Sequence, residues 1–292
     1  MRKQLVATVE RILNSDDKAV LLLGDIGVFG FRNVIQNLPD RAYNIGILEQ
    51  STIGLAAGLA KSGFIPIIHT IAPFLIERSL EQLKLDFGYQ ALGGNFISVG
   101  ASYDYAALGC THHCPGDVGE LKNIPGMEIV LPGTKDEFDR LFSAAYDNGH
   151  PTYFRLSEDA NNESYLTEFG KAVVVKKGKL ATVIAVGTML QNVVDAAVDL
   201  DVTILYYNTV SPFDSAALLE NFSSKILLCE PYYEGGLVGD ILKAVCPNHC
   251  VIDQLGVPHN FLRTYGTANE HSRLLGFTPD AIRNRINKLI SA

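Results

Sequence analysis

The residue whose type and position are best suited to chemistry is Glu49, the single carboxylate in residues 43–62. An apolar stretch at 43–47 predicts a strand. The run at 50–62, in which Gly54 and Gly58 lie four residues apart, predicts a helix whose backbone is closely packed against another element. Glu49 is thus expected at the carboxyl end of a strand and the amino end of a helix, where open α/β sheets bind ligands. The alternative is a solvated first-turn glutamate that the helix dipole stabilises.

The stretch RAYNIGILEQSTIGLAAGLAKSGFIPI, residues 41–67, resembles the pyrimidine-binding domain of transketolases and deoxyxylulose-phosphate synthases. It is most similar to the form of that family that is encoded as two separate chains. The resemblance implies that the cofactor is thiamine diphosphate and that Glu49 hydrogen-bonds N1′ of its aminopyrimidine. A carboxyl that shares a proton with N1′ favours the 4′-imino tautomer, and this imine then removes the weakly acidic C2 proton.

The same resemblance assigns further cofactor contacts. Asp25, which follows the first predicted strand, matches an early aspartate near the thiazolium. The segment TIAPFLIER at 70–78 matches the part of the family that holds the aminopyrimidine. Phe74 falls on one aromatic position, Ile71 on another that is usually aromatic, and Arg78 opens a motif similar to R-A-F-E-Q-I. A position in the hydrophobic core is the alternative for Phe74.

The loop LGCTHHCPGD at 108–117 resembles the D-G-P-T-H-x-x-x-x-D pattern of the family. The resemblance implies that His112 is the active-site histidine that contacts substrate oxygens, with His113 and Leu108 beside the substrate. A histidine suits this role because it can donate to a developing alkoxide and move a proton near neutral pH.

A zinc site is the rival explanation for this loop. Zinc prefers cysteine and histidine ligands at short spacings. The resemblance already explains the cysteines and histidines of this loop, and the strand–turn knuckle of a zinc site does not surround the second group, at 246–250. We therefore expect no bound metal on this chain. The potential ligands are Cys110, His112, His113 and Cys114, echoed by Cys246, His249 and Cys250.

Four positions depart from the family pattern. Leu108 stands where the family's loop motif begins with an aspartate, and Glu158 stands where the family has a phosphate-binding arginine. A substrate-binding histidine aligns with Gly100, and a substrate-side serine aligns with Phe29. Together these changes remove a cation and a donor and add a carboxylate that would repel a sugar phosphate. We therefore expect a sugar substrate other than an ordinary ketose phosphate, such as a nucleotide-linked or otherwise modified sugar.

The motif that holds the diphosphate of the cofactor through Mg²⁺, G-D-G followed by a distant asparagine, is absent from the sequence. Full-length transketolases carry it in an additional amino-terminal half. The resemblance therefore implies a separate diphosphate-binding subunit as partner, which would hold most of the Mg²⁺ coordination. It also implies an α2β2 assembly, and the helix at 50–62 is the expected contact between two copies of this chain.

The elements around these residues predict an α/β fold with two doubly wound, mainly parallel sheets, because short apolar strands alternate with helical patterns. The first domain is expected at residues 1–165, a polar linker at 166–179 and the second domain at 180–292. The segments ATVIAVGTMLQNVVDAA, VTILYYNTVSPFD and CEPYYEGGLVGDI resemble the carboxyl-terminal domain of transketolases. The strands are expected at 19–23, 43–47, 64–68, 96–100, 127–131, 152–156, 181–186, 202–206, 225–229 and 250–252.

Composition and charge argue against nucleic-acid-binding, membrane-spanning and secreted proteins. A formal charge of −8 without a long Lys/Arg run argues against nucleic acid as a partner. No apolar stretch reaches the roughly 18–20 residues of a membrane span, and the start has no signal-peptide core, so a cytoplasmic protein with five free cysteines is expected.

Three other functional classes stay open at this point. The first is the β subunit of a 2-oxo-acid dehydrogenase, which shares the two-domain layout and the glutamate. The second is a non-catalytic scaffolding subunit, and the third is a ligand-binding module without chemistry. Glu49 and His112 argue against the scaffolding subunit, because neither residue is needed for stability.

Overall fold

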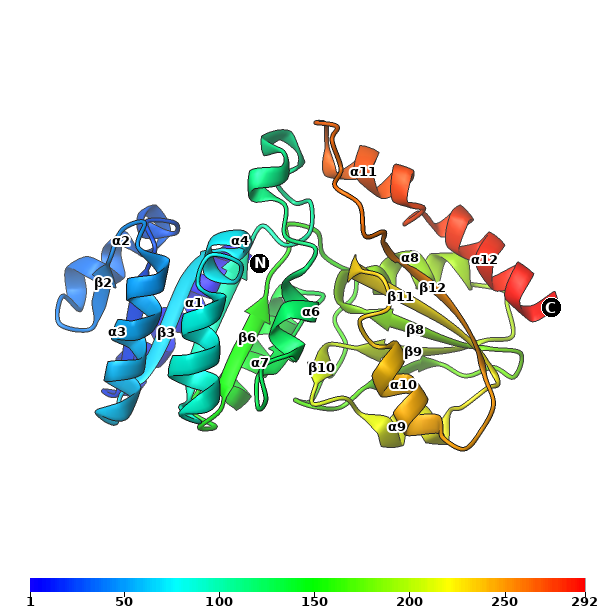
Figure 1. Cartoon of the computed structure of the whole chain (residues 1–292), viewed down its shortest axis with the longest axis horizontal. Helices are drawn as coiled ribbons and strands as arrows, with labels where there is room; N and C mark the ends of the chain where they lie inside the picture. The colour runs from blue at the N-terminus through cyan, green and yellow to red at the C-terminus, as the bar shows by residue number, and fades with distance from the viewer. Residues whose placement is uncertain (292) are drawn as a thin grey trace.

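The computed structural model describes residues 1–291, and two α/β units lie side by side in it (Figure 1). The first unit contains most of a seven-stranded sheet with the order β10-β5-β6-β4-β3-β1-β2. All its neighbouring strands are parallel except the β10–β5 pair. Its own strands are β1 Ala19–Leu23, β2 Ala42–Asn44, β3 Ile65–Ile71, β4 Gly94–Val99, β5 Glu128–Val130 and β6 Pro151–Arg155.

Helices cover both faces of this sheet. One face is buried by α1 Arg2–Ser15, α2 Val28–Asn37 and α7 Lys135–Ala145, whose side chains form one hydrophobic cluster. The other is buried mainly by α3 Glu49–Lys61, the π-helix η1 Leu83–Tyr89 and α6 Asp117–Lys122. The short helices α4 Ala72–Leu75 and α5 Leu80–Gln82 follow β3, and the turns η2 Ala106–Leu108 and η3 Cys110–His112 follow β4.

The second unit is built on a five-stranded sheet with the order β12-β11-β8-β9-β7. Only β7 runs antiparallel to its neighbour. The strands are β7 Val173–Lys176, β8 Thr182–Val186, β9 Thr203–Tyr207, β11 Lys225–Tyr233 and β12 Val251–Val257. The helices are η4 Gly187–Met189, α8 Leu190–Ala196, α9 Ser215–Glu220, α10 Val238–Val245, α11 Ala268–Leu275 and α12 Pro279–Ser291.

Two strands change the expected division of the chain. Strand β7 falls inside the segment 166–179, which is expected to be a linker, yet it pairs with β9 and belongs to the second sheet. Strand β10, Thr209–Ser211, lies in the second unit by sequence but pairs with β5 of the first sheet. One hydrophobic cluster also runs from Ile53 and Phe87 of the first unit to Ile184 and Leu228 of the second. The two units therefore share a core and a sheet edge.

The fold prediction is confirmed, and the carboxyl ends of the parallel strands position the functional residues. The strands β1, β2 and β3 lead directly to Asp25, Glu49 and Phe74. The loop after β4 rises with η2 and η3 beside α11 at the top of Figure 1. No helix in residues 1–291 is long and apolar enough to span a membrane.

Candidate functional site

Glu49 is buried at the first position of α3, with 3% of its surface exposed. Its Oε2 accepts a hydrogen bond of 2.7 Å from Nη1 of Arg78. Its Oε1 is also buried but has no hydrogen-bond partner within the described residues. A buried carboxylate oxygen without a donor costs about 1–3 kcal/mol, and this atom is free to accept a hydrogen bond from another molecule. The solvated first-turn alternative does not fit this burial.

Arg78 connects Glu49 to two other predicted residues. Its guanidinium carbon lies 4.2 Å from the centroid of the Phe74 ring, in cation–π geometry. Phe74 is half-buried and meets the imidazole of His112 edge-to-face, with ring centroids 5.4 Å apart. The structure therefore brings Glu49, Arg78, Phe74 and His112 together from three separate segments of the chain.

His112 is half-buried at the end of η3. Its Nδ1 lies 2.9 Å from Oγ1 of Thr111, and the ring of Tyr105 packs against it with centroids 6.3 Å apart. Tyr105 in turn accepts a hydrogen bond from Arg2. Sequence reasoning missed Tyr105 and Arg2, since neither belongs to a motif; the aromatic run SYDY before the loop was the one available signal.

Asp25 and Ile71 lie in different surroundings. Asp25 follows β1 with φ of 66°, is exposed, and is held by Asn44, whose side-chain amide donates to Oδ1 at 3.3 Å. It therefore lies at the same edge of the sheet as the start of α3. Ile71 is buried at the end of β3 in the core cluster that includes Ile97 and Phe154.

The residues predicted to contact the substrate lie in different parts of the structure. His113 is buried, and its ring contacts Tyr103 at 5.2 Å and His271 of α11 at 5.8 Å. Burial, with the neighbouring His271 as the next cause, lowers the pKa of His113. His113 thus joins the loop to the second unit, whereas His112 faces Phe74. Leu108 is exposed in η2.

Glu158 is not the free carboxylate that the sequence suggests. Its Oε1 accepts a hydrogen bond of 3.0 Å from Nη2 of Arg2 at the start of α1. The expected repulsion of an anionic substrate by Glu158 is therefore offset by a cation from the amino-terminal helix.

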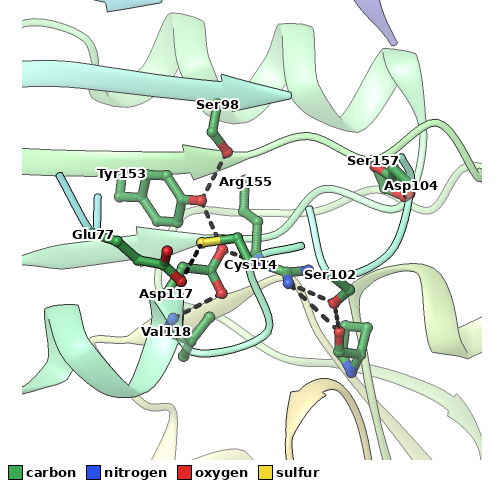
Figure 2. A network of polar contacts seen from close by, with 11 residues as sticks. Glu77, Ser98, Ser102, Asp104, Cys114, Asp117, Val118, Tyr153, Arg155 and Ser157 are labelled. Carbon is green, nitrogen blue, oxygen red and sulfur yellow. Dashed lines mark hydrogen bonds and ion pairs between the residues drawn. The ribbon is translucent and has the colours of Figure 1, made fainter. Parts of the chain in front are cut away.

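A buried polar network anchors the loop that carries His112 (Figure 2). The carboxylate of Asp117 is fully buried and accepts from Nε of Arg155 at 2.7 Å and from the hydroxyl of Tyr153 at 2.8 Å. Arg155 also donates to Oγ of Ser102 at 2.7 Å. Asp117 raises the pKa of Arg155, although burial alone would lower it. Because both ends of the loop are tied to β6, the loop has a defined position over the sheet.

A thiol and two carboxyls adjoin this network. The Cys114 thiol donates to Oε1 of Glu77 at 3.6 Å, and burial raises the pKa of Cys114 well above its usual value. Burial, with Glu77 and Asp117 nearby, raises the pKa of Glu120 to about 7. All five cysteines are free, and no group of three His, Cys, Asp or Glu side chains in residues 1–291 is arranged to hold a metal ion.

Comparison with known proteins identifies the family to which this chain belongs. The family described as "Transketolase, pyrimidine binding domain" matches residues 1–163, and "Transketolase, C-terminal domain" matches residues 170–282. The chain belongs to the transketolase family.

Individual relatives agree with this membership. An uncharacterized 33.6 kDa protein from the fasciation locus of Rhodococcoides fascians is 34% identical, over 97% of this chain and 92% of its own length. One of the subunits of an apulose-4-phosphate transketolase from Actinobacillus succinogenes is 30% identical, over 74% of this chain and 73% of its own. A solved split-gene transketolase, described as an inactive β4 tetramer, has the same fold, with a TM-score of 0.86 at 22% identity over 99% of this chain and 97% of its own.

Proposed function

We propose that this chain is the pyrimidine-side subunit of a split, thiamine-diphosphate-dependent transketolase that moves a two-carbon ketol unit between sugars. The observation that carries the proposal is the buried, unpartnered Oε1 of Glu49, set beside Arg78 and Phe74. The membership of the transketolase family and a relative named as one subunit of a transketolase support it. The diphosphate and its Mg²⁺ are assigned to a separate partner subunit.

The residues present fit an aminopyrimidine. Oε1 of Glu49 is an acceptor for a ring N–H, and the half-buried Phe74 ring, which contacts Arg78 and His112, supplies apolar surface. When bound, thiamine diphosphate supplies a nucleophilic carbon that can take up two carbons from a ketose. Arg78 fixes the rotamer of Glu49 through Oε2, so that Oε1 holds or releases a proton at one defined position.

His112 is assigned to the substrate oxygens. Its Nδ1 contacts Thr111, and its packing against Phe74 and Tyr105 fixes the plane of the ring. Nε2 is then the ring nitrogen that can donate to a hydroxyl or a developing alkoxide of the sugar. A histidine held in this way can stabilise charge as it forms without reorganising first.

The proposal is tested by the rate of C2 proton exchange of thiamine diphosphate, followed by NMR with Mg²⁺, this chain and its partner subunit. We expect fast exchange only with both subunits. Glu49→Gln should lower the rate by about 100-fold or more, because the shared proton is lost. Glu81→Gln, an exposed glutamate nearby, is the matched control. Wild-type exchange in Glu49→Gln would overturn the proposal.

We propose further that the sugar is not the ordinary pentose phosphate pair. Leu108 and Gly100 support this, because both depart from the family pattern at positions that the resemblance assigns to the substrate. The relative from Actinobacillus succinogenes is named for apulose 4-phosphate, which is consistent with such a difference in substrate. Full activity with xylulose 5-phosphate and ribose 5-phosphate would contradict this part of the proposal.

A further inference from the structure

Three buried aromatic side chains meet where α11 of the second unit contacts the loop after β4. Tyr103 and His113 lie in this loop, and His271 lies on α11. The ring centroids are 5.2 Å apart for Tyr103 and His113, 5.5 Å for Tyr103 and His271, and 5.8 Å for the two histidines. None of the three residues is more than 7% exposed. We call them the two-histidine cluster.

Each member of the two-histidine cluster has a buried polar atom without a hydrogen-bond partner in residues 1–291. The atoms are the Tyr103 hydroxyl, Nε2 of His113 and Nδ1 of His271. The large majority of buried polar side-chain atoms in proteins have a partner, so three such atoms on mutually contacting side chains indicate a ligand. Because the hydroxyl has a single O–H, it could donate to only one of the two ring nitrogens. The cluster therefore cannot satisfy itself.

The hydrogen bonds of the two imidazoles leave a lone pair on each unpartnered nitrogen. Nε2 of His271 lies 3.1 Å from the carbonyl oxygen of Thr264, and since a carbonyl only accepts, this nitrogen carries the proton. The ring of His113 donates to the backbone of Ala106. A metal-binding histidine usually donates its second ring N–H to a backbone carbonyl or a similar acceptor, which fixes the tautomer and orients the ring. Both imidazoles of the cluster meet this condition.

The separation of the two imidazoles suits one shared metal ion. Bonds from zinc to imidazole nitrogen are about 2.0–2.1 Å long, so two imidazoles on one ion have ring centroids within about 6.5 Å of each other. The observed 5.8 Å lies inside this limit. Imidazole nitrogen suits Zn²⁺, Cu²⁺ and Ni²⁺, whereas Mg²⁺ prefers oxygen ligands. The Mg²⁺ of the cofactor would therefore not compete for this cluster.

A surface cavity of about 460 Å³ gives an ion a route to the cluster. His271 lines this cavity together with Thr264, in the segment before α11, and Leu274 on the helix. Glu270 and Arg273 also line it, and their opposite charges offset each other. The cavity therefore does not repel a cation, and an accessible path is one requirement of a metal site.

We propose that the two-histidine cluster binds a divalent transition-metal ion such as Zn²⁺ through Nε2 of His113 and Nδ1 of His271. Water fills the remaining positions of the ion, and the Tyr103 hydroxyl hydrogen-bonds a metal-bound water. The ion joins α11 to the loop that carries His112 and thereby holds this loop over the candidate site. This inference goes beyond the proposed function and is independent of it.

The proposed site differs from a zinc site built on the cysteines of the loop. Cys110 is exposed and the Cys114 thiol donates to Glu77, so neither thiol belongs to the cluster. Only two of its members are imidazoles, and water with Tyr103 takes the place of a third side-chain ligand. The proposal departs from the expectation that this chain binds no metal, because the sequence does not show that His271 lies beside His113.

The test is a calorimetric titration of the metal-free, untagged full-length chain with ZnCl₂ in a buffer that contains Mg²⁺. We expect saturable binding of one zinc ion at this site. His271→Phe, which keeps an aromatic ring in the cluster, should weaken the binding by at least about 10-fold, and so should His113→Gln, because each removes a ligand. His249→Gln, at an exposed histidine beside Cys246 and Cys250, is the matched control and should bind zinc as the wild type does.

Two results of the titration would contradict the proposal. Absence of saturable zinc binding in the wild type would mean that water alone occupies the cluster. Binding that is lost in His249→Gln but kept in His271→Phe would assign the ion to the exposed group at 246–250.

A second measurement does not depend on how well the histidine variants fold. Zinc should slow hydrogen–deuterium exchange of residues 106–114 in the wild type by at least about 5-fold, because an ion that binds the joined state stabilises it by mass action. Tyr103→Phe keeps both imidazoles and should show the same slowing. Zinc that leaves loop exchange in the wild type unchanged would refute the link between α11 and the loop.

Discussion

At the scale of the residue, burial sets the charge state of His69, whose ring packs against Phe31 of α2. This histidine of β3 is buried, and its Nδ1 lies 2.9 Å from the carbonyl oxygen of Ile97. Burial lowers the pKa of His69 from 6.5 to about 4, so the ring is neutral and Nδ1 donates to that carbonyl. A Cβ on Gly27 would lie 2.8 Å from the same ring. The imidazole therefore supports the turn that carries Asp25.

This burial predicts a pH dependence of stability. The folded state binds fewer protons at His69 than the unfolded state between pH 6.5 and 4, so the free energy of unfolding should fall as the pH falls through this window. The loss should be on the order of 3 kcal/mol by pH 4.

Urea unfolding at several pH values measures this effect. His69→Gln should flatten the dependence in that window, whereas His150→Gln, at an exposed site, should not. An equally steep loss of stability in the wild type and His69→Gln would show that other groups cause it.

Four residues predicted from motifs, Glu49, Phe74, Arg78 and His112, are brought together by the fold. A resemblance can find such residues because each lies in a continuous segment with a recognisable pattern. Arg2 could not be found in this way. Its contact with Tyr105 joins residues 103 positions apart and depends on how α1 packs beside the loop after β4.

At the scale of the element, α11 contacts the loop after β4 through its buried side chain. His271 is the buried residue of this helix, and its ring contacts Tyr103 and His113. The Tyr103 hydroxyl, His113 Nε2 and His271 Nδ1 are all buried without a hydrogen-bond partner in residues 1–291. Unsatisfied atoms of this kind weaken a contact, so packing of the three rings is what joins α11 to the loop.

We therefore expect His271→Ala to loosen the loop as well as the helix. Hydrogen–deuterium exchange of residues 106–114 should speed up by about 10-fold, since local opening requires less free energy. Leu274→Ala, which truncates an exposed side chain of the same helix, is the control. Unchanged loop exchange in His271→Ala would show that the network around Asp117 holds the loop by itself.

The elements themselves were largely predictable because buried parallel strands are continuous apolar runs. Strand β1 has the predicted bounds, β8 begins one residue later than predicted, and β9 is shifted by one residue at both ends. The strands β7 and β10 were missed for a physical reason. Each has only three or four residues, and each is stabilised by pairing with a partner distant in sequence rather than by its own pattern.

At the scale of the whole molecule, the expected contact between two copies has a suitable surface. The residues Ser51, Gly54, Leu55 and Gly58 form an exposed face of α3. A Cβ on Gly58 would meet no atom within 4 Å, so another backbone could approach closely there. The helix begins at Glu49, and self-association through this face would set two candidate sites near one interface.

Charge on this face should prevent that association. We expect the full-length chain to form dimers or larger assemblies. Leu55→Glu should raise their dissociation constant by at least about 10-fold, because it would bury an unpaired charge in the interface. Leu219→Glu is the matched control, because Leu55 and Leu219 are 47% and 48% exposed. Sedimentation velocity measures the difference. A wild type that stays monomeric, or a Leu55→Glu variant that assembles normally, would exclude this face.

The pairing of β10 with β5 limits how this chain can be divided. A gene cut between the two sequence domains would leave β5 with its outer N–H and C=O groups open, since β10 would be on the other fragment. An open strand edge of this kind recruits strands from other chains and leads to aggregation. A fragment of the first unit for crystallography or gene fusion would therefore have to include residues 209–211, for example by circular permutation.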